Sequence, residues 1–218
     1  MSKIGLVLEG GGMKCAYTAG ILDAMMDNSV TFDYCIGVSA GSANGVSFIA
    51  GQRGRNIRFY TEHINEKGYF GLSSFLKTGN LFGLQYIYGT LTNSGGADPL
   101  DFDAFMKSPM EYWLVATDAQ TGKPTYFSKK DMHKDDYRHV MASCAIPAAC
   151  RPVEIDGRFY YDGGVSDSIP VQKAIDDGCD KLVIILTKPH DFVKEPERDR
   201  FIYKRLCRKY PKIIEALD

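Results

Sequence analysis

The chain has 218 residues and a formal net charge of −1, and its shares of hydrophobic and charged residues, 44% and 24%, are typical of a globular domain. This length is enough to bury a sizeable core. No apolar run reaches the roughly 18 residues of a membrane-spanning helix, and a nearly neutral chain has no general attraction for nucleic acid. The composition therefore favours a soluble single domain that does not bind DNA or RNA.

Six cysteines stand at positions 15, 35, 144, 150, 179 and 207, without the Cys-x-x-Cys spacing of a zinc site. Most of these cysteines have apolar or small neighbours. The N-terminus enters an apolar segment almost at once, which leaves no room for a signal peptide. We expect reduced thiols in a cytoplasmic protein, with no metal and no other cofactor.

Residues 3–8 are mostly apolar without alternation, which predicts a buried strand, and apolar residues at helical spacing predict a helix over 15–26. The turn between them reads Glu9-Gly10-Gly11-Gly12-Met13-Lys14. Glycines let backbone N–H groups approach an anion, either a phosphate or a developing oxyanion. The phosphate interpretation is the weaker one, because the Gly-Lys-Ser/Thr of a P-loop is absent and Cys15 stands where a dinucleotide fingerprint needs glycine.

A second short apolar strand leads into a Gly-x-Ser-x-Gly motif and then into a predicted helix over 40–50. The motif reads Gly37-Val38-Ser39-Ala40-Gly41. This order is typical of a nucleophile elbow, a strained strand-to-helix turn that exposes one serine hydroxyl. A side chain at Gly37 or Gly41 would crowd the turn or the strand–helix crossing. Taken alone, the motif is equally consistent with an ordinary turn of small residues.

A further helix is predicted over 55–66, and the segment 68–96 is irregular and rich in glycine and large apolar residues. We give equal weight to two interpretations of the segment 68–96. It forms a cap over the active site that contacts acyl chains or a membrane, or it forms short turns and helices packed into the core.

The remaining pattern predicts strands over 112–117 and 125–127, a helix over 136–143, a hairpin of 153–155 and 159–161 around Asp156-Gly157, a helix over 170–177 and a buried strand over 181–187. Such alternation favours an α/β fold, a three-layer α/β/α sandwich with a mainly parallel central sheet. Both glycine motifs then lie beyond the carboxyl ends of strands, where ligands bind in such sheets.

Asp162 ends the hairpin and is followed by Gly163 and Gly164, so its carboxylate stands on a loop with little steric cover. Asp-Gly is also a common turn pair. Beside the elbow and the glycine-rich turn, a catalytic carboxylate is the better interpretation.

Residues 191–218 are expected to form a basic C-terminal extension, with eight Lys or Arg against three acids over 194–212. Ile202, Leu206, Ile213 and Leu217 fall on one helical face that Pro211 interrupts. A basic amphipathic helix can lie on anionic lipid. We favour the alternative, a helix packed on the body. A further interpretation is that the sequence is a truncated piece of a longer protein.

Three segments, in order, resemble those of the patatin-like phospholipases and acyl hydrolases. Residues 10–14 are similar to that family's glycine-rich oxyanion motif, 37–41 to its nucleophile motif and 162–164 to its Asp-Gly-Gly motif. The Ala-Ser-Cys-Ala-Ile-Pro segment 142–147 also resembles a family segment. The resemblance spans about residues 4–187, and Cys15 stands where the family commonly has glycine.

The resemblance implies a patatin-like acyl hydrolase domain over 1–190 with a Ser39–Asp162 catalytic dyad. It also implies an oxyanion hole at the backbone of Gly10, Gly11, Gly12 and Met13. Only His190 follows Asp162, where a Ser-His-Asp triad would place its histidine. His63, His133 and His139 precede it in polar surroundings and are expected at the surface, so the dyad is the economical choice.

The predicted function is a serine acyl hydrolase that cleaves carboxylic esters of lipids, either phospholipids or acylglycerols. Two alternatives stay open: an acyltransferase that uses the same site, and a non-catalytic lipid-binding module. The expected partner is a lipid or small ester substrate, with peripheral membrane contact in addition. The sequence does not indicate an oligomeric state.

Overall fold

A computed structural model of the chain describes residues 2–189, 192 and 200–217. In this part of the chain, seven strands form one sheet in the order β5-β6-β3-β2-β1-β7, with β4 also paired to β3. The strands are β1 (Ile4–Leu8), β2 (Tyr34–Val38), β3 (Glu111–Asp118), β4 (Pro124–Ser128), β5 (Val153–Ile155), β6 (Arg158–Asp162) and β7 (Lys181–Ile185). β7, β1, β2 and β3 run parallel to one another, and β4, β5 and β6 supply the antiparallel pairs.

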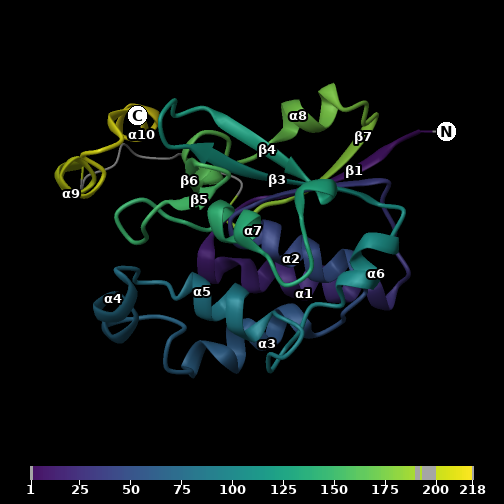
Figure 1. Cartoon of the computed structure of the whole chain (residues 1–218). Coiled ribbons are helices and arrows are strands. Elements are labelled where there is room, and N and C mark those ends of the chain that lie inside the picture. Colours follow the sequence, from purple (N-terminus) through teal and green to yellow (C-terminus); the bar gives the residue numbers. More distant parts are fainter. Residues whose placement is uncertain (1, 190–191, 193–199, 218) are drawn as a thin grey trace.

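Most helices lie on one face of this sheet, and α8 lies on the other (Figure 1). The helices are α1 (Cys15–Asp27), α2 (Ala40–Ile49), α3 (Arg55–Thr61), α4 (Leu72–Thr78), α5 (Leu84–Tyr86), α6 (Phe102–Lys107), α7 (Arg138–Ser143), α8 (Val171–Asp176), α9 (Arg200–Leu206) and α10 (Pro211–Ala216). The predicted three-layer α/β/α architecture is confirmed, with one helical layer much thinner than the other. No helix among the described residues is long and apolar enough to cross a bilayer.

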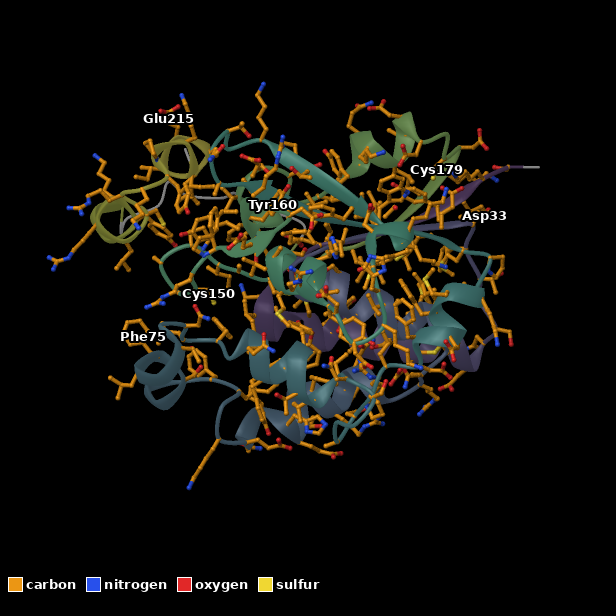
Figure 2. All side chains as sticks on the ribbon, in the orientation of Figure 1. Asp33, Phe75, Cys150, Tyr160, Cys179 and Glu215 are labelled. Atoms are coloured by element: carbon orange, nitrogen blue, oxygen red, sulfur yellow. The ribbon has the colours of Figure 1, made fainter. Side chains whose placement is uncertain are left out.

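Successive side chains of the central strands point to opposite faces of the sheet, as the period-2 geometry of a strand requires. In β1, Leu6 and Leu8 join the large core under α1, α2 and α7, whereas Val7 joins a smaller core with Ala174 of α8. Cys179, at the end of the loop after α8, closes this smaller core from the same side (Figure 2). The central strands are therefore buried on both faces, which explains their unbroken apolar sequence.

One edge of β3 holds two strands in succession. β4 pairs with residues 113–117 of β3, and it shares residues of β3 with both β2 and β6. A strand has only two edges, so β4 occupies one of them and β2 and β6 together occupy the other. The position of the functional motifs depends on this arrangement.

β2 and β6 run toward each other along that shared edge. β2 is parallel to β3 and ends with Val38 opposite Val115, while antiparallel β6 ends with Asp162 opposite Ala116. The two strands therefore stop at adjacent residues of β3. This register brings the end of β6 to the turn that follows β2.

Three expectations from the sequence are wrong in detail. The apolar run over 181–187 predicted a buried strand, but β7 pairs only with β1 among the described residues and exposes Val183 and Ile184. His63 and His139 were expected at the surface, but both are buried. His63 packs on Phe59 and contacts Asp98, and His139 packs on Phe127, so neighbouring elements cover the two rings.

The described part of the C-terminal segment packs on the body. Cys207 and Ile213 are buried in the large core, and the ring of Tyr210 lies 5.9 Å from that of Tyr161 and 6.2 Å from that of Phe159. Pro211 begins a second short helix instead of interrupting one long helix. The packed arrangement favoured from the sequence is therefore the one observed for residues 200–217.

Candidate active site

The turn after β2 has the backbone strain of a nucleophile elbow. Ser39 has φ 53° and ψ −132°, in the left-handed region that non-glycine residues rarely occupy. A Cβ at Gly37 would lie 2.6 Å from the Cα of Ser42, and one at Gly41 would lie 2.6 Å from the carbonyl oxygen of Glu9. Both glycines are therefore required by the close crossing of α2 over β1 and β2, as the sequence predicted.

The structure places Ser39 against Asp162. The Ser39 hydroxyl donates a hydrogen bond of 2.6 Å to Oδ2 of Asp162, and the Gly164 N–H donates one of 2.8 Å to Oδ1. Both side chains are buried. A Cβ at Gly163 would lie 2.3 Å from the carbonyl oxygen of Val115, so only glycine allows the chain to turn this close to β3.

The environment of Asp162 makes its carboxylate an unusually strong base for its type. Burial raises the pKa of Asp162 from its ordinary value of 3.8 to about 6, although the hydrogen bonds from Ser39 and Gly164 work in the opposite direction. Near neutral pH the carboxylate is mostly ionised. It can then accept a proton more readily than an exposed aspartate.

The glycine-rich turn lies directly beside Ser39. A Cβ at Gly10 would lie 3.0 Å from the Cβ of Ser39, and Gly12 has φ 54°. Among the described hydrogen bonds, none has the N–H of Gly11 or Gly12 as its donor. Gly10, Gly11, Gly12 and Met13 line an open groove together with Ser39 and Asp162. Backbone donors are therefore available next to the serine hydroxyl.

Three supporting side chains were not singled out from the sequence. Ser143, at the end of α7, accepts a 2.9 Å hydrogen bond from the N–H of Ser39. The buried carboxylate of Glu9 accepts a 2.7 Å bond from the N–H of Thr187, and the Thr187 hydroxyl donates a 2.7 Å bond to the carbonyl oxygen of Gly10. These contacts hold the elbow and the glycine-rich turn. The one available signal was the Ala-Ser-x-Ala-x-Pro segment, which contains Ser143.

An interior cavity opens from the same serine. Its wall is mostly apolar and includes Ser39, Ala43 and Val46 from α2 and its N-terminal end. The segment 68–96 supplies a second wall, through Tyr69, Phe82, Leu84, Ile87 and Tyr88. Both interpretations of that segment thus have support, because Tyr69 and Ile87 also belong to a buried cluster with Phe59.

Neither His63 nor His139 lines the cavity or the groove, and His190 lies outside the described residues. No group of three or more His, Cys, Asp or Glu side chains in the described ranges is placed to hold a metal ion. All six cysteines are buried free thiols. Among the described residues, the polar groups that line the groove beside Ser39 include the Asp162 carboxylate and the backbone of the glycine-rich turn.

The cost of burying the Asp162 charge is measurable as a pH dependence of stability. Its pKa is higher in the folded protein than in the unfolded chain, so folding favours the protonated form. Relative to Asp162→Asn, the wild type should lose up to about 3 kcal/mol of stability as the pH rises from about 4 to well above 6. Urea unfolding of both proteins at the two ends of this range measures it. An unchanged difference between the two would contradict the shift.

The chain matches a known protein family over most of its length. A family model described as patatin-like phospholipase matches residues 6–175. The chain is 32% identical over 200 residues to the uncharacterized protein YjjU of Escherichia coli K12, covering 89% of this chain and 55% of YjjU. It is 25% identical over 186 residues to lysophospholipase NTE1 of Cryptococcus neoformans, covering 84% of this chain and 11% of NTE1.

The chain is also similar in structure to VipD from Legionella pneumophila, with a TM-score of 0.50 and 11% sequence identity. The superposition covers 100% of this chain and 67% of VipD. This likeness concerns the fold alone. The chain spans about half the length of YjjU and about a tenth of NTE1. With the family model covering most of its length, the chain belongs to the patatin-like phospholipase family.

Proposed function

We propose that this protein is a serine acyl hydrolase that cleaves carboxylic esters of lipids through Ser39 and Asp162. The observation that carries the proposal is the 2.6 Å hydrogen bond from the Ser39 hydroxyl to the buried Asp162 carboxylate. A nucleophile within hydrogen-bond reach of a base is the arrangement that covalent acyl transfer needs. The family membership and the relatives named as lysophospholipases support a lipid ester as substrate.

Acylation begins when Asp162 accepts the hydroxyl proton as Ser39 Oγ attacks the ester carbonyl carbon. Negative charge then develops on the carbonyl oxygen, and the N–H groups of Gly10 to Met13 stabilise it. Losing one such donor typically costs roughly 3 kcal/mol of transition-state stabilisation. The protonated Asp162 then donates its proton to the leaving alcohol, and an acyl-serine remains.

Deacylation repeats these steps with water as the nucleophile. Asp162 accepts a proton from water as it attacks the acyl-serine, and the fatty acid leaves while Ser39 regains its proton. The two spaces beside Ser39 suit the two parts of a lipid ester. The apolar interior cavity would take the acyl chain, and the open groove would take the alcohol portion.

Substitution of the two central residues tests this function. Ser39→Ala and Asp162→Asn should each lower the rate of p-nitrophenyl octanoate hydrolysis by about a thousandfold or more, because each removes a group that acts in the transition state. Circular dichroism and thermal unfolding check that the variants are folded. Hydrolysis that persists in pure Ser39→Ala protein would refute the assignment.

We also propose that the protein meets its substrate at a lipid surface. Phe70, Phe75 and Leu76 form an exposed apolar tip around α4, with 54%, 41% and 77% of their surfaces exposed. Phe75 projects outward from α4 (Figure 2). The tip lies on the side of the molecule toward which the parallel strands point, where α9 and α10 also lie (Figure 1). An apolar tip beside the site is typical of contact with a membrane.

Hydrolysis of vesicles separates this surface from the chemistry. The double substitution Phe75→Ser and Leu76→Ser should lower phospholipid hydrolysis in anionic vesicles by about tenfold or more, since two large side chains no longer enter the lipid. Hydrolysis of soluble p-nitrophenyl octanoate should stay at the wild-type rate. Met106→Ser, at an exposed apolar residue of α6 on the opposite side, is the matched control. Equal losses on both substrates would contradict a surface role.

A further inference from the structure

The interior cavity follows α2 away from the serine. Ala40, Ala43 and Val46 line it at spacings of three residues, which places them on one face of the helix. Arg55 also lines the cavity and donates a hydrogen bond to Ser47 near the C-terminal end of α2. From Ser39 to Ser47 a helix advances roughly 12 Å, at about 1.5 Å per residue. The distance from Ser39 to the Arg55 end is therefore comparable to the length of an extended medium-length acyl chain.

The inner end of this cavity is polar, in contrast to its walls. Arg55, the first residue of α3, lines the cavity and is only 5% exposed. Its guanidinium donates hydrogen bonds to the hydroxyl of Ser47 (2.7 Å), to the hydroxyl of Thr92 (3.1 Å) and to the carbonyl oxygen of Asp98 (2.8 Å). A buried arginine is an unexpected feature at the end of a space for an alkyl chain.

The charge of Arg55 is incompletely matched. Its Nε lies 3.5 Å from Oδ1 of Asp98 but makes no hydrogen bond. Asp98 is already held by Arg58 through bonds of 2.6 and 2.8 Å, and by His63 at 3.2 Å. Two arginines thus share one carboxylate, and Arg58 has the better geometry. The guanidinium of Arg55 also lies 4.8 Å from the centre of the Phe59 ring. A buried cation that shares its carboxylate with a second arginine is costly, and an acceptor from a ligand would lower that cost.

We propose that the Arg55 end of the cavity binds an oxygen at the far end of the substrate's acyl chain. This inference rests on the proposed function. The preferred substrates are then esters of hydroxy-terminated or carboxy-terminated acyl groups. The apolar walls hold the methylene chain, and the guanidinium supplies the hydrogen-bond donor and positive charge that the terminal oxygen needs.

Three esters of equal length test this preference: p-nitrophenyl octanoate, its omega-hydroxy analogue and the mono-p-nitrophenyl ester of octanedioic acid. In the wild type, kcat/KM for the two oxygen-ended esters should exceed that for octanoate by about tenfold or more, as expected for a hydrogen bond to a charged group. A ratio of one or below would overturn the inference, and octanoate hydrolysis that depends on Ser39 would leave the proposed function standing.

Two substitutions assign the preference to Arg55. Arg55→Gln should bring the ratio near one. Arg58→Gln should also lower it, because Asp98 is then free to pair with Arg55, and Arg58 does not itself line the cavity. Arg58 is partly exposed, so this variant serves if Arg55→Gln does not fold. Arg53→Gln, at an exposed arginine paired with Asp27, is the control and should keep the wild-type ratio. A preference that survives both test substitutions would overturn the assignment.

If no ester is hydrolysed, the proposed function is refuted, but the proposal for Arg55 is not. A binding measurement then tests the Arg55 proposal without any hydrolysis. Calorimetric titration of Ser39→Ala protein with monomethyl octanedioate and with methyl octanoate compares the two chain ends directly, because each ligand carries its ester at the other end. Tighter binding of monomethyl octanedioate that is lost in the Ser39→Ala, Arg58→Gln double variant would support the inference. Equal binding of the two esters would overturn it.

Discussion

The site depends on one edge of β3 that is shared end to end by two strands. β2 arrives from one direction and β6 from the other, and they stop opposite the neighbouring residues Val115 and Ala116. The ladder hydrogen bonds of β3 therefore fix the separation of Ser39 and Asp162, and no flexible loop has to hold them together. Such rigid support is what a short catalytic hydrogen bond requires.

The same arrangement gives the carboxylate its basicity at a cost in stability. Burial under the ends of β2 and β6 raises the pKa of Asp162 to about 6, and among the described residues only Ser39 and Gly164 donate hydrogen bonds to its carboxylate. Strain is added by the left-handed backbone of Ser39. The rest of the molecule offsets these costs through two apolar cores, one on each face of the sheet.

The sequence predicted the parts of the site that depend on local chain geometry. The elbow, the glycine-rich turn and the Asp-Gly-Gly segment each need small residues at fixed spacing, so they are visible in the printed sequence. Ser143 and Thr187 were missed as supports because they reach the site across about a hundred residues or more of chain. The exposed edge of β7 and the burial of His63 were missed for a similar reason, since burial depends on neighbours that are distant in sequence.

The most direct test of the Ser39–Asp162 pair is the labelling of Ser39 by a fluorophosphonate, followed by mass spectrometry of the modified peptide. The reagent reacts with the serine oxygen only when a base removes its proton. We predict a single adduct on Ser39, formed at a rate that rises with pH through about 6, and no such adduct in Asp162→Asn. An adduct on another residue, or labelling of Ser39 at the same rate without Asp162, would contradict this prediction.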